Sequence, residues 1–265
     1  MYPKIVHLYG PFEINSFNLL IMIGIGIFLY KALKHPGLER YISQHDFINI
    51  SVEAALAGIM GGRLLHVISD LKNYPTFYDV ISMWNGGLSI LGALTGILLY
   101  SIISLKAKGI EILAVSDIAA LYAPLVHATA RIGCFLAGCC YGAPTSLPWA
   151  IEYTHPLVVA PLHIKIHPTQ LYSSLIYIGL FFILHSLSKQ YKPNTGVLLM
   201  SYLMGMSLER FFVDFFRGDR INVVHSSFSF LSFHQWVALS IFCIALIGLV
   251  VIRTTYHPKH PALKA

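Results

Sequence analysis

The chain has 265 residues, of which 56% are hydrophobic and 11% are charged, and its mean hydropathy is +0.67. Soluble domains carry about 25% charged residues, so this composition excludes a soluble globular protein and indicates an integral membrane protein. The formal net charge of +6 favours contact with the anionic head groups of a lipid bilayer, and no other feature of the sequence supports binding to nucleic acid.

Seven apolar segments approach the ~20 residues that a helix needs to cross the hydrocarbon of a bilayer. They cover residues 14–33, 46–68, 86–105, 116–138, 170–187, 196–216 and 234–252. Their apolar runs do not alternate with polar residues as barrel strands do. We therefore predict an all-α polytopic membrane protein, a seven-transmembrane-helix bundle in which residues 1–265 form one domain.

The first segment is longer than a signal-peptide core, and no small-residue cleavage site follows it before Lys31. We therefore predict that it is retained as a helix.

The basic residues between the segments predict the orientation. Ten lie in one set of connections: Lys31, Lys34, Arg40, Lys106, Lys108, Lys189, Lys192, Arg253, Lys259 and Lys264. Five lie in the opposite set: Lys4, Lys72, Lys165, Arg217 and Arg220. Because cytoplasmic loops carry the excess of lysine and arginine, we predict an outward N-terminus and a cytoplasmic C-terminus.

The outward connections, residues 69–85, 139–169 and 217–233, contain most of the Pro, Gly and Ser residues that interrupt helices. Residues 139–169 form the longest connection and are too polar and too rich in proline to cross a bilayer. We expect them to form a lid or a loop that faces the substrate.

Glycines cluster in the second segment and before and within the third. They are Gly58, Gly61, Gly62, Gly86, Gly87 and Gly92. We expect these glycines to allow close helix packing rather than to act in catalysis.

Arg63, Arg131 and Arg210 lie inside or at the outward ends of apolar segments. An arginine at the centre of a membrane helix costs ~3 kcal/mol, so such residues usually face a cavity, a partner or a substrate. The alternative for each one is that its side chain extends to the head groups or pairs with a neighbour.

Two groups of residues share helical faces. His127, Arg131, Cys134 and Gly138 have the spacing i, i+4, i+7 and i+11. Arg210, Asp214 and Arg217 have the spacing i, i+4 and i+7, on which one carboxylate can bridge two arginines. The second group is either a structural charge ladder or, because its charge is net positive, a site for a bound phosphate.

Seven motifs occur in one order along nearly the whole chain, and by them the chain resembles the prolipoprotein diacylglyceryl transferases. The motifs read YGPFEI, GGRLLHV, MWNGGLSILGALTG, SDIAA with ARIGCFLAGCCYG, HPTQLY, ERFFVDFFRGD and HQW. The resemblance implies a bacterial inner-membrane enzyme of lipoprotein maturation, in which the outward N-terminus predicted from the basic residues is periplasmic. Such an enzyme transfers the diacylglyceryl group of phosphatidylglycerol to the lipobox cysteine thiol in the signal peptide of a prolipoprotein and releases glycerol phosphate. It implies no cofactor and no metal.

The resemblance also assigns residues. Arg131 and Arg210 match the essential arginines of the family, and Gly133 and Gly142 match signature glycines. The family motif HP-x-Q-L-Y is present as His167, Pro168, Gln170, Leu171 and Tyr172. We expect Arg131 and Arg210 to act in catalysis. The residues expected to bind substrate are Arg131, Arg63, Gly142, His167, Tyr172 and Arg217.

Several positions depart from the family pattern. Cys134 and Cys139 replace the signature asparagine and glutamate, and Asp214 stands where a glutamate is usual. The family His-Gly-Gly is here Leu91-Gly92-Ala93, so its histidine is missing. Two tyrosine positions are also changed, to Phe17 (in Phe17-Asn18) and to Met206.

These departures leave alternatives open. His127 could replace the missing base, because it lies one turn from Arg131, and His66 is a similar candidate. The other interpretation of both is a packing histidine. A paralogue on the same scaffold could also transfer a lipid-derived group to another acceptor.

A further alternative is a membrane protein with a thiol site for redox chemistry or metal binding, formed by Cys134, Cys139 and Cys140. The simplest interpretation of the three cysteines is that their small side chains fill a helix end. Cys134 and Cys139 can meet only if the helix ends by Gly138. Cys243 lies alone in the last segment and is most simply a core residue.

Overall fold

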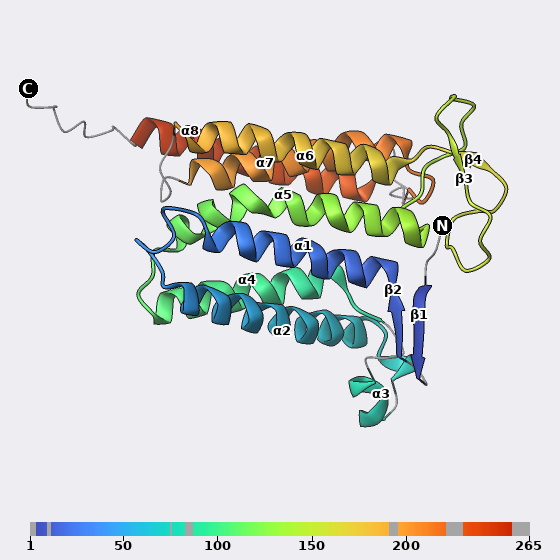
Figure 1. Ribbon diagram of the computed structural model, residues 1–265, viewed down its shortest axis with the longest axis horizontal. Helices are drawn as coiled ribbons and strands as arrows, with labels where there is room; N and C mark the ends of the chain where they lie inside the picture. Colours follow the sequence, from blue (N-terminus) through green and yellow to red (C-terminus); the bar gives the residue numbers. More distant parts are fainter. Residues whose placement is uncertain are drawn as a thin grey trace, which may run out of the picture.

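The computed structural model describes residues 4–9, 12–74, 76–82, 87–190, 196–220 and 230–255. The long helices are α1 (Ser16–Leu33), α2 (Gln44–Ser69), α4 (Ile90–Ala107), α5 (Ile112–Ala137), α6 (Thr169–Ser188), α7 (Val197–Val213) and α8 (Phe233–Thr255). The short elements are β1 (Lys4–Tyr9), β2 (Phe12–Asn15), η1 (Leu71–Asn73), α3 (Phe77–Ile81), β3 (Ile151–Glu152), β4 (Lys165–Ile166) and η3 (Asp214–Phe216). Figure 1 shows the long helices lying side by side.

Each predicted apolar segment contains one long helix, and six of these helices are long and apolar enough to cross a membrane. The protein is therefore a mostly helical, polytopic membrane protein. The helix outside this set of six is α7, which has 17 residues and carries Glu209 and Arg210 near its end.

The third helix begins later than expected. The predicted segment began at residue 86, whereas α4 begins at Ile90, where the Ser89 hydroxyl accepts a hydrogen bond from the Gly92 N–H at 3.4 Å. A serine N-cap of this kind defines a helix start more sharply than hydropathy does. Residues 83–86 of the MWNGG motif, including Gly86, lie outside the described residues.

The two ends of the bundle differ in what connects the helices. We call the end that carries the β1–β2 hairpin, α3 and residues 138–168 the outer end, and the opposite end the inner end (Figure 1). Lys34, Arg40 and Lys108 lie in connections at the inner end, in agreement with their grouping in the sequence. Lys192, Lys259 and Lys264 lie outside the described residues.

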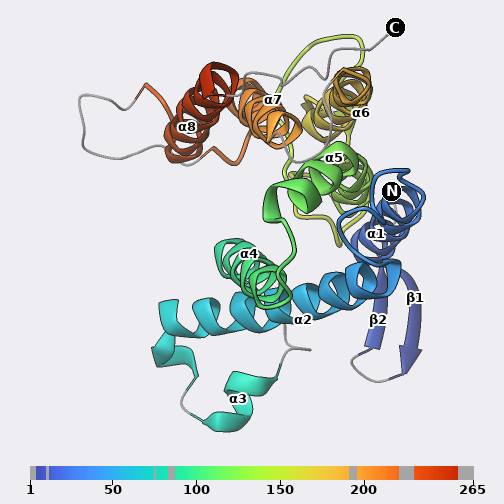
Figure 2. The ribbon, with the colours of Figure 1, turned by 90° about the vertical axis from the view of Figure 1, so that its left-hand side faces the viewer.

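The helices form two groups that have few contacts with each other. In the larger group, α1 and α6 pack against α5, α7 packs against α5 and α6, and α8 packs against α7. The smaller group is the pair α2 and α4, which lies beside the row of other helices in Figure 2. The larger group contains the main apolar core, with Ile118, Leu121 and Leu184 among its buried residues.

Glycines produce the close contact between α2 and α4. A Cβ atom at Gly92 would overlap the carbonyl oxygen of Gly61, and one at Gly61 would lie 2.5 Å from the carbonyl oxygen of Gly92. Gly58 and Gly62 face side chains and backbone of α4 in the same way. The prediction that these glycines serve packing is confirmed for this pair of helices.

Asp117, in the SDIAA motif, joins α5 to the start of α7. Its buried carboxylate accepts hydrogen bonds from the N–H groups of Gly196 at 2.8 Å and Leu199 at 2.9 Å. These N–H groups belong to the first turn of a helix and have no partner within it, so a carboxylate from another helix supplies one. The motif therefore fixes α7 against α5.

The connection between α5 and α6 is folded rather than extended. Strands β3 and β4 pair in antiparallel fashion, and Tyr153, Ala160 and Ile166 form a small buried core. The Tyr153 hydroxyl donates a 2.9 Å hydrogen bond to the Phe135 carbonyl, which attaches this connection to the end of α5. We call residues 138–168 the cap.

Candidate active site

A polar pocket lies at the outer end, where the end of α5, the start of α6 and the end of α7 meet. Its lining residues are Arg131, Cys140, Thr169, Gln170, Ser173, Glu209, Arg210, Val213 and Arg217. These side chains fill the pocket so closely that it has no room for a water molecule.

The lining of the pocket has an excess of positive charge, with three guanidinium groups and the carboxylate of Glu209. Among the described residues, Arg131 makes no hydrogen bond and no ion pair within 4 Å, so its donors remain for a ligand. Glu209 is buried and accepts hydrogen bonds from the hydroxyls of Ser173 and, at 2.9 Å, Tyr177. This arrangement suits an anion with several acceptor oxygens, such as a phosphate.

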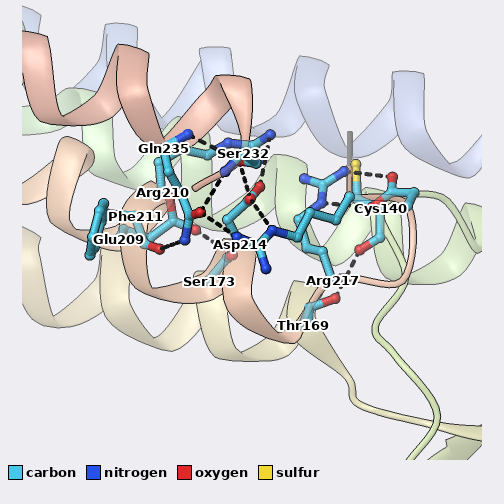
Figure 3. A network of polar contacts seen from close by, with 12 residues as sticks. Cys140, Thr169, Ser173, Glu209, Arg210, Phe211, Asp214, Arg217, Ser232 and Gln235 are labelled. Atoms are coloured by element: carbon cyan, nitrogen blue, oxygen red, sulfur yellow. Dashed lines mark hydrogen bonds and ion pairs between the residues drawn. The ribbon is translucent and has the colours of Figure 1, made fainter. Parts of the chain in front are cut away.

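Asp214 connects Arg210 to Arg220 beside the pocket, as Figure 3 shows for Arg210 and Asp214. The Arg210 Nη2 atom lies 3.5 Å from Asp214 Oδ1, and the Arg220 Nε atom lies 3.7 Å from Asp214 Oδ2. The buried carboxylate also accepts a hydrogen bond from the Ser232 hydroxyl. Asp214 thus orients Arg210 without lining the pocket itself.

The expected ladder of Arg210, Asp214 and Arg217 forms only in part. Arg217 pairs with Asp219 through two hydrogen bonds of 2.8 and 2.6 Å, whereas Arg220 approaches Asp214. The alternative in which Asp214 bridges both arginines does not form, because it required a continuous helix. Helix α7 ends at Val213, the 3-10 turn η3 follows, and the backbone of Arg217 is extended.

Gln235, in the HQW motif, stabilises this corner from the start of α8. Its side-chain oxygen accepts hydrogen bonds from the Ser232 N–H at 2.9 Å and from Arg220 at 2.8 Å. The Ser232 hydroxyl in turn accepts a 3.1 Å hydrogen bond from the Gln235 N–H, which completes a capping box. The motif is therefore a helix start that also positions Arg220.

The loop that follows α5 contacts the start of α6 and the segment that follows α7. Thr169 and Gln170 donate hydrogen bonds of 2.8 and 2.7 Å to the carbonyls of Cys140 and Cys139. Gly142 forms an isolated β-bridge with Arg217, and a Cβ atom at Gly142 would overlap the His167 carbonyl. The signature glycine therefore serves the close crossing of two backbone segments at the rim of the pocket.

The three cysteines of the signature lie together. Helix α5 ends at Ala137, Gly138 has a left-handed φ of 71°, and the Sγ atoms of Cys134, Cys139 and Cys140 lie within 4.8 Å of one another. The condition that the helix ends by Gly138 is thus met. Hydrogen bonds from the other two thiols lower the pKa of Cys140. Burial raises this pKa, and the guanidiniums of Arg217 and Arg131 lower it.

The fourth cysteine, Cys243, lies apart from the cluster, on α8. It is exposed, so the prediction that it is a core residue is wrong.

His127 does not line the pocket. Its Nε2 atom lies 2.8 Å from the Tyr202 hydroxyl, and its ring stacks on Tyr177 with the ring centroids 4.7 Å apart. Tyr177 in turn donates to Glu209. His127 is therefore linked to Glu209 of the pocket through Tyr177.

Arg63 and His66 lie apart from the pocket, at the outer end of α2. The Arg63 guanidinium donates hydrogen bonds to four backbone carbonyls between residues 79 and 87, at 2.7 to 3.1 Å. The His66 Nε2 atom lies 3.0 Å from the Tyr74 hydroxyl. These contacts fix the connection between α2 and α4.

His167 and Tyr172 line a second, apolar groove beside the pocket. The groove has a volume of about 410 Å³ and is formed by Leu147, Trp149, His167, Tyr172, Ile176, Phe212, Val213 and Phe216. The Tyr172 hydroxyl accepts a 2.7 Å hydrogen bond from the Trp149 indole and lies 3.3 Å from His167 Nδ1. Because Val213 lines both spaces, the groove adjoins the arginine pocket.

Sequence reasoning missed Glu209, Ser173 and Tyr177. The signal for Glu209 was a carboxylate next to Arg210 within an apolar segment, where an ionisable residue is costly and usually paired. Ser173 and Tyr177 lie one and two turns into α6 on the face that carries Thr169, and only the packing of α6 on α7 shows that they meet Glu209.

Two positions that depart from the family pattern lie in different surroundings. Leu91 is exposed at the start of α4, while Met206 packs against the main core in α7. Neither residue lines the arginine pocket.

Comparison with known proteins gives one consistent result. The family model described as prolipoprotein diacylglyceryl transferase matches residues 3–251. A phosphatidylglycerol–prolipoprotein diacylglyceryl transferase of Clostridium tetani is 34% identical over 90% of this chain and 93% of its own. Proteins of the same name from Thermotoga maritima and Bordetella avium are 30% and 29% identical, over 94% and 96% of this chain and 85% and 91% of their own.

Proposed function

We propose that the arginine pocket is the active site of this chain, which belongs to the prolipoprotein diacylglyceryl transferase family. The protein is an enzyme, a phosphatidylglycerol–prolipoprotein diacylglyceryl transferase of lipoprotein biosynthesis, and its substrates are a phospholipid and a prolipoprotein. A phospholipid has both a phosphate and apolar acyl chains, so the enzyme must bind both close together. The pocket and the adjoining groove supply one polar and one apolar space at such a point.

Arg131, Arg210 and Arg217 bind the phosphate of phosphatidylglycerol in this proposal. The observation that carries it is that Arg131 has no ion pair with a described residue, although it faces a pocket inside the bundle. The first turn of α6 also lines the pocket through Thr169, Gln170 and Ser173, and the N-terminus of a helix attracts anions.

The arginines also stabilise the leaving group. When the acceptor sulfur attacks the terminal glycerol carbon, the carbon–oxygen bond breaks and negative charge accumulates on the departing glycerol phosphate. Guanidinium groups fixed in a site that excludes water stabilise this charge more than water does, because they need no reorientation. Asp214 and Asp219 hold Arg210 and Arg217 in place for this role.

The acyl chains lie in the apolar groove on this proposal, so that phosphatidylglycerol reaches the pocket laterally from the bilayer. His167 and Tyr172 line the groove together with Phe212 and Phe216. The lipobox cysteine of the signal peptide approaches from the outer side, beneath the cap. Gly142 permits the cap to cross the rim of the pocket without displacing His167.

His127 is a positioning residue in this proposal, because it contacts Tyr177 and Tyr202 rather than the pocket. Its effect on the site passes through the hydrogen bond from Tyr177 to Glu209. Arg63 stabilises the connection between α2 and α4 and affects the substrate only through that connection.

We further propose that α7 is the seventh membrane crossing. Together with η3 it extends from Val197 to Phe216, which is close to the length that a crossing requires. Seven crossings place the N-terminus in the periplasm and the C-terminus in the cytoplasm of a bacterial inner membrane, with the pocket near the periplasmic face.

Complementation tests the site. The chain and its variants are expressed in cells depleted of their own transferase, and the mass increase of a lipobox peptide is measured. Arg131→Ala is expected to reduce transfer by at least about 100-fold, the typical cost of losing one fixed donor to developing negative charge. Arg131→Lys keeps the charge but loses the planar set of donors and is expected to recover little.

Arg253→Ala, at the inner end of α8, is the matched control and is expected to transfer at the rate of the unchanged chain. Near-normal transfer by Arg131→Ala, at equal amounts of folded protein in the membrane, would contradict the assignment of the pocket.

A further inference from the structure

The three-cysteine cluster is a built feature of the outer end of α5. The chain reverses direction at Gly138, the N–H of Cys139 donates to the Cys134 carbonyl at 3.2 Å, and Cys139 and Cys140 return toward the last turn of the helix. Cys140 has a φ of 55°, and it is one of two non-glycine residues with positive φ in the described part of the chain. Such a backbone is uncommon outside glycine, and here it directs a thiol toward two others.

The spacing of the sulfur atoms is close to that of a metal site. Zinc–sulfur bonds of about 2.3 Å in a tetrahedron separate the sulfur atoms by about 3.8 Å. All three Sγ atoms lie within 4.8 Å of one another, so a shift of about 1 Å at most would bring them to this geometry. Three protein ligands leave the fourth position of the tetrahedron open, as in catalytic rather than structural zinc sites.

The charges around the cluster favour thiolate ligands. Three thiolates around a divalent ion carry one net negative charge, and a fourth thiolate adds another. The guanidiniums of Arg217 and Arg131 interact electrostatically with Cys140 and offset this charge. Cys140 itself lines the arginine pocket, so the cluster adjoins the space assigned to the phosphate.

We propose that Cys134, Cys139 and Cys140 bind a zinc ion whose fourth position takes the acceptor cysteine as a thiolate. The catalytic part rests on the proposed function, because that function requires a deprotonated thiol as nucleophile. Among the residues that line the arginine pocket there is no histidine to act as the base. A metal-bound thiol is deprotonated without such a base.

The reaction balances without an oxidant. The acceptor thiol gives its proton to water when its sulfur binds the zinc ion. That sulfur then attacks the terminal carbon of the diacylglyceryl group, a carbon–sulfur bond forms, and the carbon–oxygen bond to the phosphate breaks. The bonding pair leaves with the glycerol phosphate oxygen beside Arg131. The thioether, a weak ligand, then leaves the zinc ion.

The first experiment measures metal rather than activity. The full chain is purified in detergent without chelators, and zinc per chain is determined by elemental analysis for the unchanged protein and for Cys134→Ser, Cys139→Ser, Cys140→Ser and Cys243→Ser. We expect about one zinc ion per chain in the unchanged protein and in Cys243→Ser, and at least a 10-fold loss in each of the other three.

A second measurement guards against variants that fail to fold. The unchanged protein is loaded with Co²⁺ alone, and thiolate ligation is expected to produce a sulfur-to-cobalt charge-transfer band. Absence of both stoichiometric zinc and this band in the folded, unchanged protein would overturn the metal site. A disulfide between two of the three cysteines in protein taken directly from the membrane would overturn it as well.

Transfer assays separate this proposal from the function on which it rests. Zinc removal by a chelator should abolish transfer, and added zinc should restore it. Full transfer by zinc-free protein would refute the catalytic role of the metal and leave the transferase function intact. Zinc-loaded, folded protein that transfers nothing to a lipobox peptide would instead refute the proposed function.

Discussion

Asp214 and Asp219 each pair with an arginine of the pocket, but they differ in burial. The Asp214 side chain is 1% exposed and lies between Arg210 and Arg220, whereas Asp219 is 33% exposed beside Arg217. Loss of a buried carboxylate from an ion pair costs about 3–5 kcal/mol, whereas a fully exposed pair contributes about 0–1 kcal/mol. The Arg217–Asp219 pair lies between these cases, because Asp219 is partly exposed while Arg217 is only 11% exposed. The two aspartates therefore form a matched pair for mutation.

Asp214→Asn is expected to lower the melting temperature and to raise KM for phosphatidylglycerol more than it lowers kcat, because Arg210 loses its orientation. Asp219→Asn is expected to lower the melting temperature and to raise KM as well, but less, because Asp219 is 33% exposed and water can replace part of its contact with Arg217. Asp214→Glu keeps the carboxylate and should retain more activity than Asp214→Asn. Equal effects of the two asparagine variants on KM would contradict a positioning role that is specific to Asp214.

The sequence predicted the three arginines of the pocket but not the residues with which they pair. Arg131 and Arg210 were found by their cost in an apolar segment and by the resemblance to the family, and Arg217 was found by its spacing from Arg210 and by the same resemblance. The partners of these residues were not, because a pairing such as that of Arg217 with Asp219 depends on where α7 ends. Helix ends depend on backbone geometry that hydropathy does not report.

The pair α2 and α4 shows how glycines determine the spacing of helices. At Gly92 an added Cβ would overlap the carbonyl oxygen of Gly61, which belongs to a helix backbone and cannot rotate away. At Gly26, on α1, an added Cβ would meet nothing within 4 Å. The same substitution therefore has opposite expected effects at the two positions.

Gly92→Ala is expected to destabilise the protein by about 1–3 kcal/mol, the usual cost of overpacking, as α2 and α4 separate. Gly26→Ala is expected to be neutral or to stabilise α1 by up to about 1 kcal/mol, because alanine is the better helix former. Thermal unfolding in the same detergent compares them. Equal stability of the two variants would show that the backbone contact does not limit the packing.

At the scale of elements, the sequence predicted the positions of the long helices because each crosses an apolar layer and needs a long apolar run. It did not predict the β1–β2 hairpin, α3 or the β3–β4 pairing within the cap. These elements are short, and the cap depends on non-local contacts such as that of Tyr153 with Phe135. Propensity carries little information about segments of two to six residues.

The connections that carry the excess of lysine and arginine lie at the opposite end of the molecule from the pocket. The connections at the inner end carry the larger share of lysine and arginine, whereas the pocket, the groove and the cap lie at the outer end. If the inner end is cytoplasmic, the active site opens near the periplasmic face, where the signal peptide of an exported prolipoprotein emerges from the membrane. The basic residues and the proposed function therefore both predict a cytoplasmic inner end.

A labelling experiment tests this orientation. Thr154→Cys places a thiol on the exposed surface of the cap, away from the groove, and Gln190→Cys places one after α6 at the inner end. In intact cells an impermeant maleimide is expected to label the cap thiol above the background of the native cysteines, because that thiol faces the periplasm. The thiol at position 190 should react only after the membrane is permeabilised. The reverse pattern would place the pocket on the cytoplasmic side and contradict both the basic-residue rule and the proposed approach of the acceptor.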